Sequence, residues 1–373
     1  MILARILVVD DDSGILRSVE RVLGHHYEVV CTLSPAEAIE LSNQFKPDLA
    51  ILDIRMPEMD GFQLMGRLKD SRPDLDIILM TGSVHELDAQ LVRAIREKAF
   101  YFLQKPFDRE VLLTLVERCL ELRKLERKNH LHLMRLEKEL AEARAFQQSL
   151  LPPEHGSVGG ISVFARYIPC SGLGGDFYDY ASTGHPGATV IVADVSGHGV
   201  SAAMLTGIVK SAFHSASVDA YAPISIVERI SVGLRAFSSD QFITLICVRV
   251  YFDGPLLEYV NAGHPPGILW EEGCAPAFLE ATGPLISPAF PDFSWRQETL
   301  RPQRQDRLLL FTDGISEIEG EHELYGVERM VVELKKKQQR GPELLDQILG
   351  SAKRFSGGRP IHDDLTLLTM TLK

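Results

Sequence analysis

The run LAILDIRMPEMDG at residues 49–61 decides the fold of the first part of the chain. It opens with four apolar residues that end on Asp53, and an apolar run of this length indicates a buried strand. Similar runs at residues 6–9, 29–31, 77–80 and 100–103 are separated by amphipathic stretches. This alternation predicts an α/β domain with a doubly wound, parallel five-stranded sheet.

The residues at the ends of these strands indicate the chemistry. Ligands of a doubly wound sheet bind beyond the carboxyl ends of its strands. Those ends hold Asp10, Asp11, Asp53, Thr81 and Lys105. Converging carboxylates repel each other, so a hard divalent cation such as Mg²⁺ is the expected occupant. A lysine, a hydroxyl and Mg²⁺ around one carboxylate are typical of phosphoryl transfer to that carboxylate, which makes Asp53 the candidate nucleophile.

Four motifs resemble the CheY-like receiver domain of bacterial two-component response regulators, over residues 1–120: ILVVDDD (6–12), LAILDIRMPEMDG (49–61), LMTGS (79–83) and FLQKPF (102–107). The resemblance implies that Asp53 is the phosphoacceptor. It implies Mg²⁺ ligands at Asp10, Asp11 and the backbone carbonyl of Arg55.

The same resemblance implies that Thr81 and Lys105 contact the phosphoryl group and that Phe102 is the aromatic residue that repacks. Because Asp12 follows directly, the pair of acids that binds Mg²⁺ could be shifted by one residue along the sequence. The alternation of side chains after Val9 favours Asp10 and Asp11.

Residues 108–151 predict one long helix that continues the last receiver helix. Counted in alternating steps of three and four, nine of twelve positions are apolar in the series Leu112, Leu115, Cys119, Leu122, Glu126, Asn129, Leu133, Leu136, Leu140, Ala143, Gln147 and Leu150. This register favours a coiled coil and a parallel homodimer. The polar positions 126 and 129 leave a single solvated linker helix as the alternative. Pro152 and Pro153 end the helix.

Residues 152–373 predict an α/β sandwich of antiparallel sheets flanked by helices. Aspartates stand where its buried strands begin or end: Asp176, Asp194, Asp313 and Asp363. An acid in such a place is costly unless it is paired or metal-bound. If the four meet, their repulsion is on the order of 15–20 kcal/mol, which two divalent cations offset better than one. Two hard metals form a hydrolytic site for a phosphoester.

Six motifs resemble the SpoIIE-like branch of the metal-dependent PPM-family Ser/Thr phosphatases, over about residues 145–373: RAFQQSLLP (144–152), GGDFYDY (174–180), VADVSGHGVSAAMLTG (192–207), YVNAGHPP (259–266), LLLFTDGISE (308–317) and HDDLTLL (362–368). The resemblance implies that Asp194 bridges two metals and that Val195 lends its backbone carbonyl. It implies that Asp176, Asp313 and Asp363 complete the two sites, with Asp364 as an open alternative to Asp363.

The resemblance also implies two Mn²⁺ or Mg²⁺ ions and a phosphoserine or phosphothreonine protein as substrate, commonly a STAS-domain anti-sigma-factor antagonist. The two halves together predict a response regulator whose phosphatase output is controlled by phosphorylation of Asp53. A sensor histidine kinase or a small phosphodonor would supply the phosphoryl group. The sequence leaves open whether phosphorylation activates or inhibits.

Two rival functions belong to other classes. The first is a non-catalytic adaptor that binds a sigma or anti-sigma factor through a phosphatase-like domain. The second is a DNA-binding regulator, which the charge disfavours because 39 basic residues against 51 acidic ones give −12. His198 and His264 are weak candidates for a general acid, since such histidines more often bond nearby backbone.

Composition sets the cellular setting. The five cysteines are far apart and form no CxxC pair, which favours buried or idle thiols over a zinc or disulfide scaffold. The apolar start of the chain runs into three carboxylates, and no apolar stretch is long enough to span a bilayer. We therefore expect a cytoplasmic protein with neither nucleic acid nor membrane as a partner.

Overall fold

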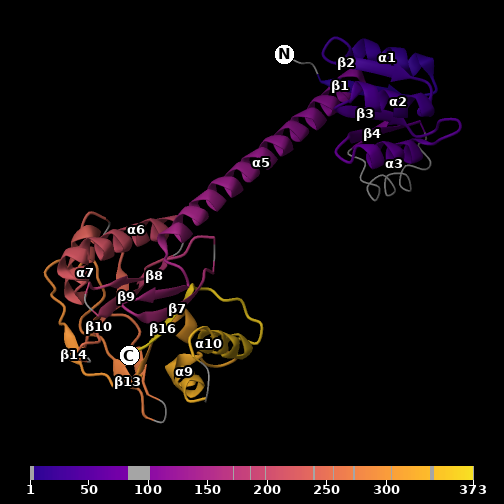
Figure 1. The fold of residues 1–373 in the computed structure, drawn as a ribbon. Helices are drawn as coiled ribbons and strands as arrows, with labels where there is room; N and C mark the ends of the chain where they lie inside the picture. The colour runs from indigo at the N-terminus through magenta and orange to yellow at the C-terminus, as the bar shows by residue number, and fades with distance from the viewer. Residues whose placement is uncertain are drawn as a thin grey trace. The chain divides into compact units, whose positions relative to one another are not determined.

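A computed structural model describes residues 4–82, 101–170, 172–184, 186–197, 199–237, 240–254, 256–271, 274–303, 305–336 and 340–372. The chain divides into two compact units, Met1–Leu136 and Glu137–Lys373. Figure 1 shows the elements that build each unit.

The first unit is built on a parallel sheet, as the alternating pattern predicts. Its strands are β1 (Arg5–Val9), β2 (Glu28–Thr32), β3 (Leu49–Asp53), β4 (Asp76–Thr81) and β5 (Tyr101–Gln104). They lie in the order β2-β1-β3-β4-β5, and each neighbouring pair is parallel. The doubly wound fold is confirmed.

Helices cover both faces of this sheet because the strand side chains alternate between two cores. Leu7 and Val9 belong to one hydrophobic cluster, and Ile6 and Val8 to the other. The covering helices include α1 (Ser13–Leu23), α2 (Pro35–Phe45) and α3 (Gly61–Ser71). At α2 the predicted start is present, since the Ser34 side chain accepts a hydrogen bond from the Glu37 amide.

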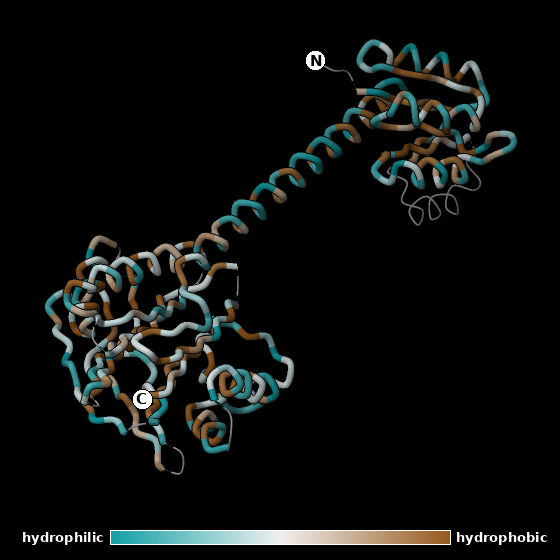
Figure 2. The backbone as a smooth tube through the Cα atoms, viewed as in Figure 1, coloured by the Kyte–Doolittle hydropathy of each residue, from teal (hydrophilic) through white to brown (hydrophobic). Residues whose placement is uncertain are grey.

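The predicted long helix is α5 (Arg109–Leu150), with 42 residues. Its first turns pack into the core of the first unit, where Leu112 and Cys119 are buried. Near its end Gln147 is buried in the second unit. Figure 2 shows mainly hydrophilic positions along the middle of the helix, broken by single hydrophobic ones.

The predicted seam is therefore divided. Its two ends are packed within the units, so a partner helix cannot use them. In the middle, Leu133, Leu136 and Leu140 are 52–59% exposed. The helix thus packs into the first unit at one end, is exposed in its middle and packs into the second unit at its other end. The sequence shows these three parts as one register, because an apolar stripe of the same spacing runs through all of them.

The second unit contains two antiparallel sheets. One has the strand order β14-β11-β10-β9-β8 and the other β13-β12-β15-β16-β7-β6. The strands are β6 (His155–Val158), β7 (Ile161–Ile168), β8 (Asp176–Ser182), β9 (Gly187–Val195), β10 (Ile243–Tyr251), β11 (Leu256–Ala262), β12 (Gly267–Trp270), β13 (Ala277–Leu279), β14 (Glu298–Leu300), β15 (Arg307–Phe311) and β16 (Leu365–Thr371). The helices are α6 (Val200–Ser215), η1 (Ala216–Asp219), α7 (Pro223–Leu234), α8 (Asp313–Ser316), α9 (Gly326–Leu334) and α10 (Pro342–Phe355).

The two sheets pack face to face with helices outside, which confirms the predicted sandwich. Along β9, Ile191 and Ala193 face a core shared with α6 and α7, whereas Val190 and Val192 face the other sheet. A third core lies between the second sheet and helices α9 and α10. Asp194 lies two residues after Val192, so the alternation of side chains along β9 directs it toward the other sheet.

In the described part of the chain, none of the helices has both the length and the apolar character needed to cross a membrane.

Candidate functional site

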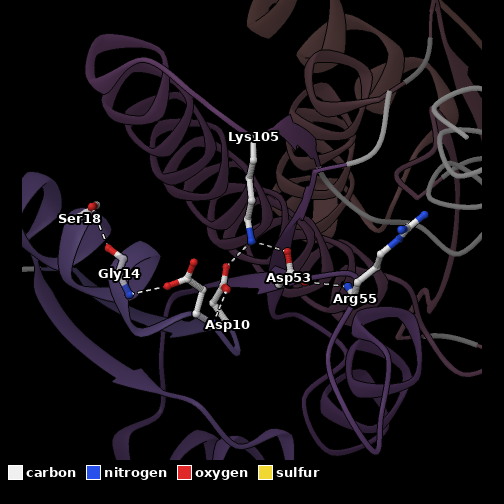
Figure 3. A network of polar contacts seen from close by, with 7 residues as sticks. Asp10, Gly14, Ser18, Asp53, Arg55 and Lys105 are labelled. Carbon is white, nitrogen blue, oxygen red and sulfur yellow. Dashed lines mark hydrogen bonds and ion pairs between the residues drawn. The ribbon is translucent and has the colours of Figure 1, made fainter. Parts of the chain in front are cut away.

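The first candidate site lies at the carboxyl end of the parallel sheet (Figure 3). The Lys105 ammonium donates to Asp10 Oδ2 and to Asp53 Oδ1, each at 2.5 Å. Asp10 is fully buried and Asp53 nearly so. The structure therefore brings together three predicted residues from three different strand ends.

The charges at this end of the sheet depend on one another. Burial raises the pKa of Asp10 above its ordinary value, and hydrogen bonds from Lys105 and the Asp12 amide offset part of that rise. Burial alone would lower the pKa of Lys105, but its contacts with Asp10 and Asp53 raise it. Lys105 is thus held in its charged form between two acids.

The remaining predicted residues surround Asp53. The Arg55 amide donates to Asp53 Oδ2 at 2.7 Å. Thr81 is buried at the end of β4, and its carbonyl accepts a 2.7 Å hydrogen bond from the Lys105 amide. Phe102 lies in β5, partly buried against the core under β3 and β4.

The three consecutive acids after β1 have different environments. Asp12 caps α1, since its Oδ1 accepts from the Gly14 amide at 2.6 Å. Asp11 is exposed, and Asp10 is buried beside Lys105. The geometry favours Asp10 and Asp11 over a pair that includes Asp12, because the cap already occupies Asp12.

The second candidate site lies where the two antiparallel sheets meet. Asp176 and Asp194 are directly opposite each other on β8 and β9. Like charges in such a cross-strand pair destabilise a sheet unless something compensates them. Asp176 is buried, and its Oδ2 accepts hydrogen bonds from Thr312 at 2.7 Å and Thr366 at 2.6 Å, which extend from the other sheet.

Carboxylates from distant parts of the chain act on Asp194. Burial and the charges of four acids raise its pKa to about 7; in order of size these are Asp313, Asp363, Asp364 and Glu317. Burial, followed by the charge of Asp194, raises the pKa of Asp176 well above its ordinary value. The predicted acids therefore gather at one place and repel each other there.

Asp313 begins α8, two residues after the end of β15, and Asp363 lies two residues before β16. Burial and the nearby Glu317 raise the pKa of Asp313. A cavity of about 200 Å³ beside these elements is lined by Glu317, Asp363 and their neighbours. Of the four predicted acids, Asp363 alone lines this cavity.

Asp364 has a different role from its neighbour Asp363. It is buried, and its two oxygens accept from the amides of Cys170 at 2.8 Å and Gly175 at 2.6 Å. Asp363 is exposed. Because Asp364 is occupied by backbone donors, Asp363 is the better candidate for a metal ligand.

Two glycines allow the backbone to come close to the acids. A Cβ on Gly175 would lie 2.5 Å from the Val195 carbonyl oxygen and 3.5 Å from Asp194 Oδ1. Gly197 has a φ of 86°, a conformation that L side chains rarely adopt. The Val195 carbonyl therefore lies against the β7–β8 loop next to Asp194.

The acid set fits hard divalent cations by its chemistry, since carboxylate oxygens are their preferred ligands. The fit is incomplete in geometry: within the described residues, no three His, Cys, Asp or Glu side chains surround one point closely enough to hold an ion. Hydroxyl and amide donors already bind oxygens of Asp176 and Asp364.

Sequence patterns do not indicate Thr312, Thr366 and Gln147 as parts of this site, and they leave Asp364 as an alternative to Asp363. Thr312 directly precedes Asp313, and Thr366 lies two residues after Asp364. A hydroxyl within two residues of an acid is the signal that the sequence offers. The apolar spacing places Gln147 in the coiled-coil seam, which does not indicate its contact with the Gly174 peptide.

Neither histidine gains support as a general acid. His264 is buried, its Nδ1 lies 2.8 Å from Thr244 Oγ1, and burial lowers its pKa to about 3. It is therefore neutral at physiological pH. His198 lies outside the described residues.

Family comparisons match both parts of the chain. The model described as stage II sporulation protein E (SpoIIE) matches residues 185–373, which is half of the chain. The model described as response regulator receiver domain matches residues 6–117.

Individual relatives match one part or the other. Phosphoserine phosphatase RsbP of Bacillus subtilis (strain 168) is 29% identical over 183 residues, or 48% of this chain and 45% of RsbP. Transcriptional regulatory protein GlrR of Escherichia coli (strain K12) is 38% identical over 119 residues, or 32% of this chain and 26% of GlrR. The chain thus spans less than half the length of these two relatives.

The SiaA-PP2C domain of Pseudomonas aeruginosa is a similar solved structure. It is 22% identical with a TM-score of 0.57, and the match covers 65% of this chain and 99% of that one. At this identity the likeness supports the fold alone.

Proposed function

This chain belongs to the stage II sporulation protein E (SpoIIE) family and carries a response regulator receiver domain, and from that premise we propose that it is a metal-dependent phosphoprotein phosphatase under receiver control. The observation that carries the proposal is the gathering of acids around Asp194. Asp176 lies opposite Asp194 across β8 and β9, and acids from two other segments, residues 313–317 and 363–364, raise the pKa of Asp194 together with burial. Divalent cations would relieve that repulsion.

In this proposal Asp194, Asp176, Asp313, Asp363 and the Val195 carbonyl would hold two cations, Mn²⁺ or Mg²⁺, with Asp194 as the shared ligand. Such cations supply positive charge that stabilises phosphoryl transfer to water. Thr312 and Thr366 orient Asp176 by donating to its Oδ2. The buried Asp364 orients the loop that precedes Asp176.

The proposed substrate is a protein that carries phosphoserine or phosphothreonine. The printed name of the RsbP relative, a phosphoserine phosphatase, supports this substrate class. We propose a STAS-domain anti-sigma-factor antagonist as the partner, so that dephosphorylation releases a sigma factor indirectly.

The receiver would accept a phosphoryl group on Asp53 from a sensor histidine kinase or a small phosphodonor. Mg²⁺ would be held by Asp10, Asp11 and the Arg55 carbonyl. Lys105, which already contacts Asp53, would balance the added charge, and Thr81 would bind the phosphoryl oxygens. Phe102 lies next to this end of the sheet and would repack.

The test is release of phosphate from a phosphoserine-bearing STAS-domain protein by the full chain with Mn²⁺. Turnover should stop on chelation and return with Mn²⁺. Asp194→Asn should lose about 100-fold or more, because even outer-shell changes at metal sites cost 10- to 100-fold. Asp253→Asn is the matched control, since Asp253 is an exposed acid in a β-hairpin. Equal turnover in both variants would reject the metal site.

A second candidate function is a non-catalytic adaptor. It is favoured by the finding that, within the described residues, no three ligand side chains surround one point. An adaptor would bind a sigma or anti-sigma factor without hydrolysis. Calorimetric titration with Mn²⁺ separates the two. The enzyme should bind Mn²⁺ in a manner that depends on Asp194, whereas the adaptor should show no such binding to its second unit.

A further inference from the structure

The loop between β7 and β8 leads directly into Asp176, the first residue of β8. Its glycines have no side chains to hold them in place. The position of the Asp176 backbone therefore depends on what binds the peptide groups of Gly174 and Gly175, while Thr312 and Thr366 hold its carboxylate.

On one side the loop is bound by Asp364. Oδ2 of Asp364 accepts the Gly175 amide at 2.6 Å and the Asp176 amide at 3.4 Å. A Cβ on Gly174 would lie 2.2 Å from the same Oδ2 and 2.3 Å from the Tyr167 hydroxyl. The loop thus lies against Asp364 with no room for a larger residue.

On the other side the loop is bound by Gln147, in the last turns of α5. Its Nε2 donates to the Gly174 carbonyl at 2.5 Å, and its Oε1 accepts the Gly174 amide at 3.2 Å. Gln147 is only 7% exposed. Three residues earlier, Arg144 Nε donates to the Gly172 carbonyl at 2.7 Å.

One peptide group joins the two sides. The carbonyl of the Gly174–Gly175 peptide binds Gln147, and the amide of the same peptide binds Asp364. A rotation of this peptide would break both bonds. Next to it, the Gly175 carbonyl accepts the Val195 amide at 3.2 Å, so the loop is also tied to the residue after Asp194.

We propose that Gln147 is a positioning residue for the metal site, which links helix α5 to the placement of Asp176 through the Gly174–Gly175 peptide. The inference rests on the proposed function insofar as Asp176 is a metal ligand. It assigns to the helix a specific contact through which a change in α5 would alter metal affinity.

The experiment compares Gln147→Ala and Gln147→Met with Gln148→Ala in the full chain. Gln147→Met keeps the length of the side chain and removes both hydrogen bonds. Gln148 is the matched control, because it is the next residue of the same helix and is exposed. Thermal melting establishes that each variant folds.

The first measurement is hydrogen–deuterium exchange of the peptide that covers residues 172–176, without metal. Both Gln147 variants should exchange faster there than wild type, while Gln148→Ala should not. The second measurement is Mn²⁺ affinity by calorimetry. The Kd should rise by about 5- to 30-fold in the Gln147 variants, as expected for buried peptide groups that lose their partners. Saturating Mn²⁺ should restore phosphatase turnover.

Unchanged exchange and unchanged Mn²⁺ affinity in folded Gln147→Met would overturn the proposal. A failure of the proposed function looks different, since wild type would then bind no Mn²⁺ at the second unit. In that case the exchange measurement alone decides whether Gln147 holds the loop.

Discussion

Three consecutive carboxylates, Asp10, Asp11 and Asp12, have three different environments in the first unit. Asp10 is buried against Lys105, Asp11 faces solvent, and Asp12 caps α1. Residue type alone does not separate them, because all three are aspartates in a row. The separation comes from the end of β1 and the first turn of α1.

These roles predict opposite outcomes for two neighbouring substitutions. Asp12→Ala should lower the free energy of unfolding of the first unit by about 1 kcal/mol through loss of the cap. It should leave phosphorylation of Asp53 by acetyl phosphate intact. Asp11→Ala should abolish Mg²⁺-dependent phosphorylation with little effect on stability. Intact mass and thermal melting measure both, and the reverse result would put Asp12 in place of Asp11 in the acidic pair.

His264 predicts a pH dependence of stability in the second unit. Its pKa is about 3 when folded against an ordinary value of 6.5, so between these values the unfolded chain binds a proton that the native state does not. The contribution of His264 to stability should therefore fall as pH drops below about 6.5, by up to about 4–5 kcal/mol at pH 3. The raised pKa values of Asp176 and Asp194 act in the opposite direction, so this contribution is read from the difference between wild type and a variant at His264. Urea unfolding followed by tryptophan fluorescence measures this, since Trp270 and Trp295 both lie in the second unit.

The control is His264→Asn, whose amide can replace Nδ1 beside Thr244. Between pH 6.5 and 5, wild type should lose stability relative to this variant. A slope that is unchanged in His264→Asn would assign the pH dependence to other groups.

Among the elements, α5 carries the largest difference between pattern and structure. The sequence predicts its existence and its length, because one apolar register continues through it. It includes Leu112 and Cys119 in the receiver range and also in the coiled-coil register, and it does not show that they are buried in the core of the first unit. Nor does it reveal that Gln147 belongs to a loop contact. Burial against another element and burial in a coiled coil require the same spacing of apolar residues.

The strands and sheets were more predictable. Each strand of the parallel sheet follows from a short apolar run, and the four acids of the second unit mark strand ends. What the sequence could not give is the environment of each acid. The difference between Asp363 and Asp364 arises from amides of residues 170 and 175, almost two hundred positions away.

The exposed middle of α5 predicts an association test. Leu136→Glu should reduce the mass of a homodimer toward that of a monomer in analytical ultracentrifugation, since a charge in a coiled-coil seam is costly. Leu131→Glu is the matched control, because Leu131 is 67% exposed but lies off the seam register. A wild-type monomer, or an equal effect of the two substitutions, would contradict the coiled-coil homodimer.

For the whole molecule, the proposed positioning role of Gln147 makes metal affinity the quantity that the receiver should change. Beryllofluoride, a phosphoryl mimic, should alter the Mn²⁺ Kd of the second unit in wild type by about 5-fold or more, within the usual range of coupling between sites. The effect should disappear in Asp53→Asn. It should also be much smaller in Gln147→Met. An equal response in Gln147→Met would place the coupling elsewhere.

Because α5 is a single helix of 42 residues, its length fixes the rotation of its last residues relative to its first ones around the helix axis. Each residue inserted into its exposed middle turns all later positions by about 100° around the helix axis, whereas seven residues bring them back to within about 20°. A series of insertions should therefore give a periodic response. Signalling would be lost with two or five added residues and regained with seven, because only the seven-residue insertion nearly restores the angular alignment of the two ends of the helix.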